Sequence, residues 1–409
     1  MATLKGYTTG YVLIPLDEEA RQAVVSGENT LAVHVTRTDD GQSLDARLVQ
    51  VQERGAGGSP RPRSFRKDPQ TGVTDMAHPR ATLALVAVLA GGVAGAPALY
   101  GQSPGGRTGT LVVLNKEPGT ATFVDVATGA RLATLPTGPA PHELAMSSDG
   151  RRAVATNYGG NTLTVLNVAG LEVVRTIDLG EHRRPHGAFF LPGDTLLAVT
   201  SETSRMVLLV NVNAGTVAAT LGTGAGGSHM VAITGDGSTL YTGNISDGTV
   251  SRLDVASGTL ARTYSVPPEP EAITVTRDGR QVWVGSNEQG VISLLDTETG
   301  EVETALDGFG WPYRILLVPE RSLVVIPDLE GNLVRFADLA TRDAVGRIEL
   351  PDAAPQGVAL SGDRGTLFLS LNGKGQVAVI DLGTRTVTRT LEVGRTPDGI
   401  GWSPLRLRE

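Results

Sequence analysis

The chain has 409 residues, no cysteine, 52 glycines and a formal net charge of −8. The absence of cysteine excludes thiolate nucleophiles, disulfides, sulfur-ligated zinc or iron–sulfur centres and c-type haem attachment. The acidic balance argues against a nucleic-acid partner, which needs a basic surface. A hydrophobic fraction of 40% suffices for a folded core, and abundant glycine with few helix signals favours β-structure with many turns.

The first 75 residues predict two unlike segments. Residues 1–53 contain short apolar runs, including Tyr-Val-Leu-Ile-Pro-Leu from Tyr11, and they indicate a β-rich fragment with too few strands to bury its own core. In its stretches 11–16, 27–34 and 41–45 this fragment resembles the tail of a galactose-binding-like jelly roll. Residues 54–75 are rich in glycine and proline and carry five positive charges in their first fourteen positions, so they predict a linker.

Residues 76–98 have the pattern of a signal peptide. A short basic segment from Met76 precedes the apolar stretch 81–90, and Ala96-Pro-Ala98 provides small residues for cleavage. The apolar stretch is short for a membrane span, and the alternative is a buried helix or strand. Because the signal is internal, the simplest hypothesis is that Met76 is the natural start and that residues 1–75 come from a mis-called or fused reading frame. The predicted location is periplasmic or extracellular.

From Thr110 onward the sequence repeats seven times. Each repeat contains a short segment in which a turn leads into an apolar strand. When these seven segments are aligned, their third position is occupied by His142, His186, His229, Glu271, Tyr313, Gln356 and Asp398. The spacing is 42 to 44 residues, and a period near 40–45 with four strands per unit is typical of a β-propeller.

The strand pattern predicts how the ring closes. The run 110–135 supplies only the second, third and fourth strands of a blade, whereas 398–403 supplies only a first strand. Pairing them completes a seventh blade and protects the sheet edges. We therefore predict an all-β fold over 99–409, a seven-bladed β-propeller of four-stranded blades closed by pairing the C-terminal strand with the N-terminal blade.

The repeats resemble the YVTN, or YncE-like, family of β-propellers. The resemblance rests on Met146-Ser-Ser-Asp-Gly150, Ala155-Thr-Asn157, Asp296-Thr-Glu-Thr-Gly300 and Val377-Ala-Val-Ile-Asp381. It covers roughly residues 107–405 and implies the propeller fold without implying a reaction, because this family lacks a shared one. Function must therefore be argued from a site.

Strand direction places a candidate site at one mouth of the central channel. The start of each first strand and the end of each second strand lie at the same rim, because neighbouring strands run antiparallel. The candidate ligand-binding residues are His142, His186, His229, Glu271, Tyr313, Arg314, Gln356, Asp398, Asn157, Glu202, Asn244, Asn287, Asp328 and Asn372.

Three adjacent blades present histidine at the rim, and the next presents Glu271. Imidazole and carboxylate groups are ligands for divalent metals, so His142, His186, His229 and Glu271 form a candidate metal site. Two alternatives stay open: the histidines hydrogen-bond the backbone of a neighbouring blade, or they line a ligand pocket without a metal. The asparagines have their own alternative, which is hydrogen bonding within turns.

The leading hypothesis is a secreted or periplasmic binding protein with a polar ligand or metal site at the channel mouth. Its ligand would be a small molecule, a metal ion or a partner protein, and the mature chain would be a monomer without a membrane span. The alternative is a metal-assisted hydrolase or lyase, because lactonases and streptogramin lyases resemble this architecture. A third class is redox, in which a haem would belong to a separate chain.

Overall fold

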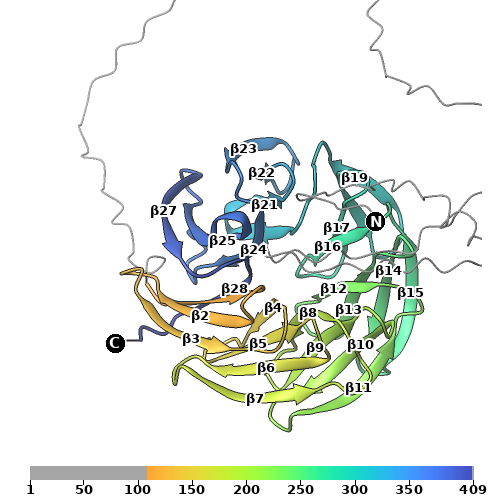
Figure 1. The fold of residues 1–409 in the computed structure, drawn as a ribbon. Helices are drawn as coiled ribbons and strands as arrows, with labels where there is room; N and C mark the ends of the chain where they lie inside the picture. The colour runs from red at the N-terminus through yellow and green to blue at the C-terminus, as the bar shows by residue number, and fades with distance from the viewer. Residues whose placement is uncertain (1–107, 408–409) are drawn as a thin grey trace, which may run out of the picture. The chain divides into compact units, whose positions relative to one another are not determined.

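The computed structural model describes residues 108–407, which form seven four-stranded antiparallel sheets arranged in a ring (Figure 1). Within this range the secondary structure consists of strands and two short 3-10 turns, and no helix is long and apolar enough to cross a membrane. The prediction of a seven-bladed all-β propeller is confirmed. The expected fragment over 1–53, linker over 54–75 and signal peptide over 76–98 lie outside the described residues.

We number the blades in chain order, with the split blade as blade 1. Blade 1 contains β28 (Pro397–Ser403), β1 (Thr110–Asn115), β2 (Thr120–Asp125) and β3 (Arg131–Pro136). Blade 2 contains β4 (Pro141–Met146), β5 (Arg152–Asn157), β6 (Thr162–Asn167) and β7 (Glu172–Asp178). Blade 3 contains β8 (Pro185–Phe190), β9 (Leu196–Ser201), β10 (Met206–Asn211) and β11 (Thr216–Gly222).

The remaining blades repeat the pattern. Blade 4 contains β12 (Ser228–Ile233), β13 (Thr239–Asn244), β14 (Thr249–Asp254) and β15 (Thr259–Ser265). Blade 5 contains β16 (Pro270–Val275), β17 (Gln281–Ser286), β18 (Val291–Asp296) and β19 (Val302–Leu306). Blade 6 contains β20 (Leu316–Val318), β21 (Leu323–Asp328), β22 (Leu333–Asp338) and β23 (Ala344–Glu349). Blade 7 contains β24 (Pro355–Leu360), β25 (Thr366–Leu371), β26 (Gln376–Asp381) and β27 (Thr386–Glu392).

The C-terminal strand closes the ring as predicted. Strand β28 pairs antiparallel with β1, and Thr110 lies opposite Ser403. Two side chains reinforce this pairing: the Trp402 indole donates to the Thr108 carbonyl at 3.0 Å, and the Thr110 hydroxyl donates to the Leu405 carbonyl at 2.8 Å. The two ends of the domain therefore meet in one sheet and leave no open edge at the junction.

The place of a strand in its blade matches its hydropathy. The second and third strands of a blade are almost entirely buried, whereas fourth strands such as β7 are exposed along most of their length. The turns between first and second strands use the predicted Ser-x-Asp-Gly chemistry. In blade 2 the Asp149 carboxylate accepts from the Ser147 hydroxyl at 2.7 Å and from the Arg151 amide at 2.9 Å, and Gly150 supplies the left-handed φ of +68°.

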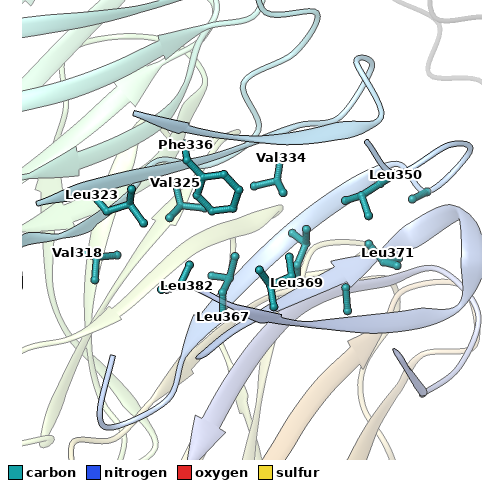
Figure 2. Packing of buried hydrophobic residues seen from close by; sticks show 13 residues of the cluster. Val318, Leu323, Val325, Val334, Phe336, Leu350, Leu367, Leu369, Leu371 and Leu382 are labelled. Carbon is teal, nitrogen blue, oxygen red and sulfur yellow. The ribbon is translucent and has the colours of Figure 1, made fainter. Parts of the chain in front are cut away.

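The core lies between neighbouring blades. Figure 2 shows the cluster between blades 6 and 7, where Val325 and Phe336 face Leu367 and Leu369. A comparable buried cluster lies at each of the other six interfaces between blades, including the one where the split blade meets blade 7. Removing this apolar surface from water stabilises the ring by about 25 cal/mol per Å² of buried area. Because the core lies between the blades, the polar residues at the channel are not needed for it.

Blade 6 departs from the repeat at its innermost strand. Strand β20 has three residues, whereas the first strands of the other blades have six or seven. The segment 310–315 takes the place of the missing strand residues and makes one isolated bridge, between Pro312 and Asp328. As a result, Tyr313 and Arg314 precede the regular strand and reach residues of distant blades.

Candidate functional site

The predicted rim is visible in the strand register. Pro141, at the start of β4, pairs with Asn157 at the end of β5. Ser228 and Asn244 have the same relationship in blade 4. The residues that follow these pairs therefore approach one another around one mouth of the channel.

Three histidines from adjacent blades form a buried cluster at this mouth. His142, His186 and His229 belong to β4, β8 and β12, and their exposed fractions are 6%, 0% and 8%. The ring of His186 stands edge-on to that of His142, with centroids 4.2 Å apart. On its other side it lies against the His229 ring, at a centroid distance of 3.5 Å and an interplanar angle of 31°. His186 is thus the central member.

His186 differs from its neighbours in its hydrogen bonding. Neither its Nδ1 nor its Nε2 has a hydrogen-bond partner among residues 108–407, although both atoms are buried. Burial, together with the nearby charges of His229 and His142, lowers the pKa of His186 well below its usual value. A neutral imidazole has one acceptor nitrogen and one donor nitrogen, so this ring offers unused bonding capacity at the centre of the cluster. Such a buried polar group needs an explanation.

His142 is held by a carboxylate from the closing strand. Its Nδ1 donates to Oδ2 of Asp398, which is fully buried in β28. The same carboxylate accepts from Lys116 Nζ at 3.1 Å and from the Tyr313 hydroxyl at 3.1 Å. Burial alone would raise the pKa of Asp398, but the charges of His142 and Lys116 outweigh it and keep the pKa below its usual range. The ionised Asp398 therefore fixes the orientation of the His142 ring.

His229 lies between two carboxylates. Its Nδ1 donates to Oε1 of Glu202, and its Nε2 lies 3.7 Å from Oε1 of Glu271. Burial alone would lower the pKa of His229, but the hydrogen bond to Glu202 and the charge of Glu271 raise it to about 9. The Tyr158 hydroxyl donates to the second oxygen of Glu202 at 2.9 Å. His229 is therefore protonated at neutral pH.

Glu271 and Arg314 complete the polar cluster. Glu271 Oε2 accepts from the Asn287 amide and from the Trp311 indole, the latter at 3.0 Å. The Arg314 guanidinium donates to Glu143 of blade 2, and its other terminal nitrogen lies 3.7 Å from Glu271. Because Arg314 comes from blade 6, these contacts connect three blades around the channel.

The charges of the cluster nearly balance. The carboxylates of Glu143, Glu202, Glu271 and Asp398 are all at least 86% buried. They face three permanently cationic side chains, namely Lys116, Arg184 and Arg314. The proton on His229 adds a positive charge to this cluster, which lowers the cost of its buried carboxylates.

Two sets of three residues bring potential metal ligands together. In the first, one donor atom each from His142, Glu143 and His186 lies within 4.8 Å of the others. In the second, the same holds for His186, Glu202 and His229. His186 belongs to both sets, whereas Glu271 belongs to neither and reaches the cluster through His229.

Several sequence-predicted residues serve the scaffold. The side-chain amide of Asn157 donates to Thr162 and Thr164 at 2.9 and 3.0 Å, and that of Asn244 donates in the same way to Thr249 and Ser251. Asp328 accepts from the backbone amides of 310, 311 and 331. These three side chains are engaged within their own blades.

A shift of one residue separates the scaffold positions from the site positions. Asn157 ends its strand, but Glu202 follows the end of β9 by one residue, as Asn287 and Asn372 follow the ends of β17 and β25. These residues reach the rim, where Glu202 and Asn287 contact His229 and Glu271, and Asn372 donates to Gln356 at 2.9 Å. From the repeat alone, both positions are expected at the end of a second strand.

Sequence reasoning also missed three residues of the cluster: Lys116, Glu143 and Tyr158. Lys116 and Tyr158 occupy the position one residue beyond a second strand, in blades 1 and 2. A register set one residue later would have identified them.

A separate cavity of about 440 Å³ lies at Ala127, Thr366 and Arg389, and none of the three clustered histidines lines it.

Comparison with known structures supports the fold. No protein-family model matches the chain, and no match is found among curated proteins. Similar solved structures include a chain of hydrazine synthase from Kuenenia stuttgartiensis, with 18% identity and a TM-score of 0.60, covering 70% of this chain and 99% of that one. Another is a functionally unknown protein from Desulfotomaculum acetoxidans, with 17% identity and a TM-score of 0.62, covering 72% of this chain and 99% of that one. At this identity the likeness shows the β-propeller fold.

Proposed function

We propose that this chain is an exported β-propeller binding protein that holds a divalent transition-metal ion at one mouth of its channel. The observation that carries the proposal is His186, a fully buried imidazole between two other histidines, neither of whose nitrogens has a hydrogen-bond partner among the residues that the structure describes. Buried polar groups normally have hydrogen-bond partners. A metal ion would satisfy one of these nitrogens.

The surroundings of the outer histidines suit this role. Asp398 binds Nδ1 of His142, and Glu202 binds Nδ1 of His229, which leaves Nε2 of each ring as the metal-facing nitrogen. Carboxylates on the far nitrogen of a ligating histidine orient the ring and raise its basicity. Imidazole and carboxylate ligands without sulfur favour zinc, copper, nickel or iron over the alkaline earths. Glu271 stays a proposed ligand through its contact with His229.

Metal binding by the full chain tests the proposal. The purified protein is stripped with a chelator, incubated with Zn²⁺ or Co²⁺, desalted and analysed for bound metal. We expect stoichiometric binding by the wild type and a large loss in His186→Ala. His182→Ala is the matched control, because this histidine lies outside the cluster residues. No retained metal in the wild type would reject the proposal.

A metal-assisted hydrolase or lyase is a second candidate, favoured by the gathering of His142, Glu143 and His186 and of His186, Glu202 and His229 into two sets of potential metal ligands. A metal bound there would polarise a substrate carbonyl. A screen of lactones and esters with metal-loaded and metal-stripped protein would test it. Equal rates in both samples would exclude the metal-assisted reaction.

Export and family membership are also proposals. The pattern in 76–98 supports removal of a signal peptide after Ala98 and a periplasmic or extracellular location. N-terminal sequencing of the natural protein would test this, and a mature chain that retains residues 1–75 would contradict it. The repeat motifs support membership of the YVTN family.

A further inference from the structure

We propose that the site holds two metal ions and that His186 bridges them through its two ring nitrogens. This inference rests on the proposed metal-binding function and makes it more specific. It starts from a property of the two ligand sets: each has its own outer histidine and its own carboxylate, and His186 alone belongs to both.

The bonding capacity of His186 fits a bridge. A histidine that ligates one metal normally gives its second nitrogen to a carboxylate, a carbonyl or water. His142 and His229 follow this rule with Asp398 and Glu202. His186 does not, since neither of its nitrogens has a protein partner within the described part of the chain. Two metal ions, one on each nitrogen, would use both atoms.

Each half-site has its own outer histidine. The first contains His142 with the Glu143 carboxylate, and the second contains His229, whose Nδ1 is held by Glu202. His186 lies between them, with its ring centroid 4.2 Å from one outer ring and 3.5 Å from the other. Each ion would thus receive one imidazole of its own and one nitrogen of the shared ring, Glu143 would add a carboxylate to the first ion, and imidazole ligands of this kind suit copper or zinc.

Ligation of both ring nitrogens changes the protonation of His186. The neutral imidazole carries one N–H proton, which leaves to solvent when the second ion binds, so that the shared ring becomes an imidazolate anion. No oxidation or reduction is involved. Metal ligands must be deprotonated in this way.

Metal stoichiometry and magnetic coupling test the bridge in the full chain. Stripped protein is titrated with Cu²⁺, bound copper is measured after desalting, and electron paramagnetic resonance counts the unpaired spins. We expect two copper ions per chain with a spin count far below the copper content, because an imidazolate bridge couples the two ions. Two ions with a full spin count would overturn the bridge, as would a single ion per chain.

Variants of the half-sites sharpen the test. His142→Ala and His229→Ala should each retain one ion, and its spin should be fully detected. His182→Ala should keep both ions and the coupling. If His186→Ala does not fold, the wild-type copper and spin counts still decide the question. One ion per chain rejects the bridge but keeps the proposed function, whereas no bound metal rejects both.

Discussion

Asp398 of the closing strand binds Nδ1 of His142 in the next blade, so one carboxylate joins the closure of the ring to the candidate site. The two residues are 256 positions apart in sequence. Strand β28 can deliver Asp398 to this place only when it is paired with β1, at the opposite end of the domain. The integrity of the site and the closure of the propeller are therefore coupled.

Replacing Asp398 should lower the affinity of the protein for metal while the propeller fold is kept. Asp398→Asn keeps the volume of the side chain but removes the charge that orients His142 and pairs with Lys116. Loss of such a supporting carboxylate typically costs about 10- to 100-fold in metal affinity. Competition with a chromophoric chelator would measure the change.

The same variant should also be less stable without metal. His142 and Lys116 would lose a buried partner, and breaking a buried pair costs about 3–5 kcal/mol. For both the stability and the affinity measurements, Asp343→Asn is the control, because this carboxylate is exposed. If Asp398→Asn binds metal as tightly as the wild type does, Asp398 does not support a metal ligand.

Removing the closing strand should destabilise the whole domain. A chain ending before Pro397 lacks β28, and it also loses the hydrogen bond from Trp402 to Thr108. The exposed edge of β1 would then be open to aggregation. We expect a markedly lower melting temperature or insoluble protein, measured by circular dichroism. A chain lacking only residues 408–409 should behave as the wild type, and an unchanged transition in the longer deletion would contradict closure by β28.

The repeat predicted the fold well because it is a local pattern. Each blade carries the same turn chemistry and apolar strands, so seven registers identified seven sheets and the split blade. The site was harder to predict because it depends on which way single side chains point at a strand end. Asn157 and Glu202 differ by one position relative to their strands, and this difference sends one amide into its blade and one carboxylate to His229.

The contacts across the channel could not be predicted from the repeat. Arg314 and Glu143 are 171 residues apart, and their pairing depends on the shortened first strand of blade 6. Nothing in the period of 42 to 44 residues indicates where an irregular blade sends its side chains. The sequence therefore placed Arg314 at the rim, but its partners emerged only from the assembled ring.

Stability of the metal-free protein should fall as the pH rises toward 9. The pKa of His229 is raised to about 9 in the folded state, against 6.5 unperturbed. A raised pKa contributes stability that is fully present below pH 6.5 and is lost as the pH passes through 9. The shift corresponds to about 3 kcal/mol. Urea unfolding at several pH values between 6 and 10 would measure it.

A variant separates this effect from general alkaline destabilisation. His229→Gln cannot take up the proton, so its stability should change less across the same pH range. His182→Gln should retain the wild-type profile. Parallel pH profiles for His229→Gln and wild type would contradict the assignment of this effect to His229.

The lowered pKa of His186 affects stability on the acid side. Stability is lost as the pH falls below the unperturbed value of 6.5, because only the unfolded chain then binds that proton.

Gly399 should be intolerant of a side chain because the strands approach closely around the channel. A Cβ at Gly399 would lie 2.5 Å from the His142 carbonyl oxygen and 2.8 Å from the Leu144 amide. Gly399→Ala must therefore displace β4 together with His142, and such overpacking costs about 1–3 kcal/mol. Gly222→Ala is the control, since its Cβ would meet nothing nearer than 3.9 Å. Equal melting temperatures for the two variants would show that β4 and β28 are not held this closely.

Arg314→Met should destabilise the protein through the charges that it leaves behind. The guanidinium is buried and faces Glu143 and Glu271 from two other blades, and these carboxylates keep its pKa above its usual value although burial opposes this. Removing one partner of a buried ion pair costs about 3–5 kcal/mol, because the remaining charge stays uncompensated.

A second substitution tests that explanation of the Arg314 effect. Adding Glu143→Gln to Arg314→Met removes one of the two orphaned carboxylates, so the double variant should recover part of the lost free energy of unfolding in urea. If the loss instead came from the packing of Arg314 on the Tyr313 ring, 4.1 Å away, the second substitution would restore nothing. A non-additive double-mutant cycle would therefore identify the charge pair as the interaction that connects blades 2 and 6 across the channel.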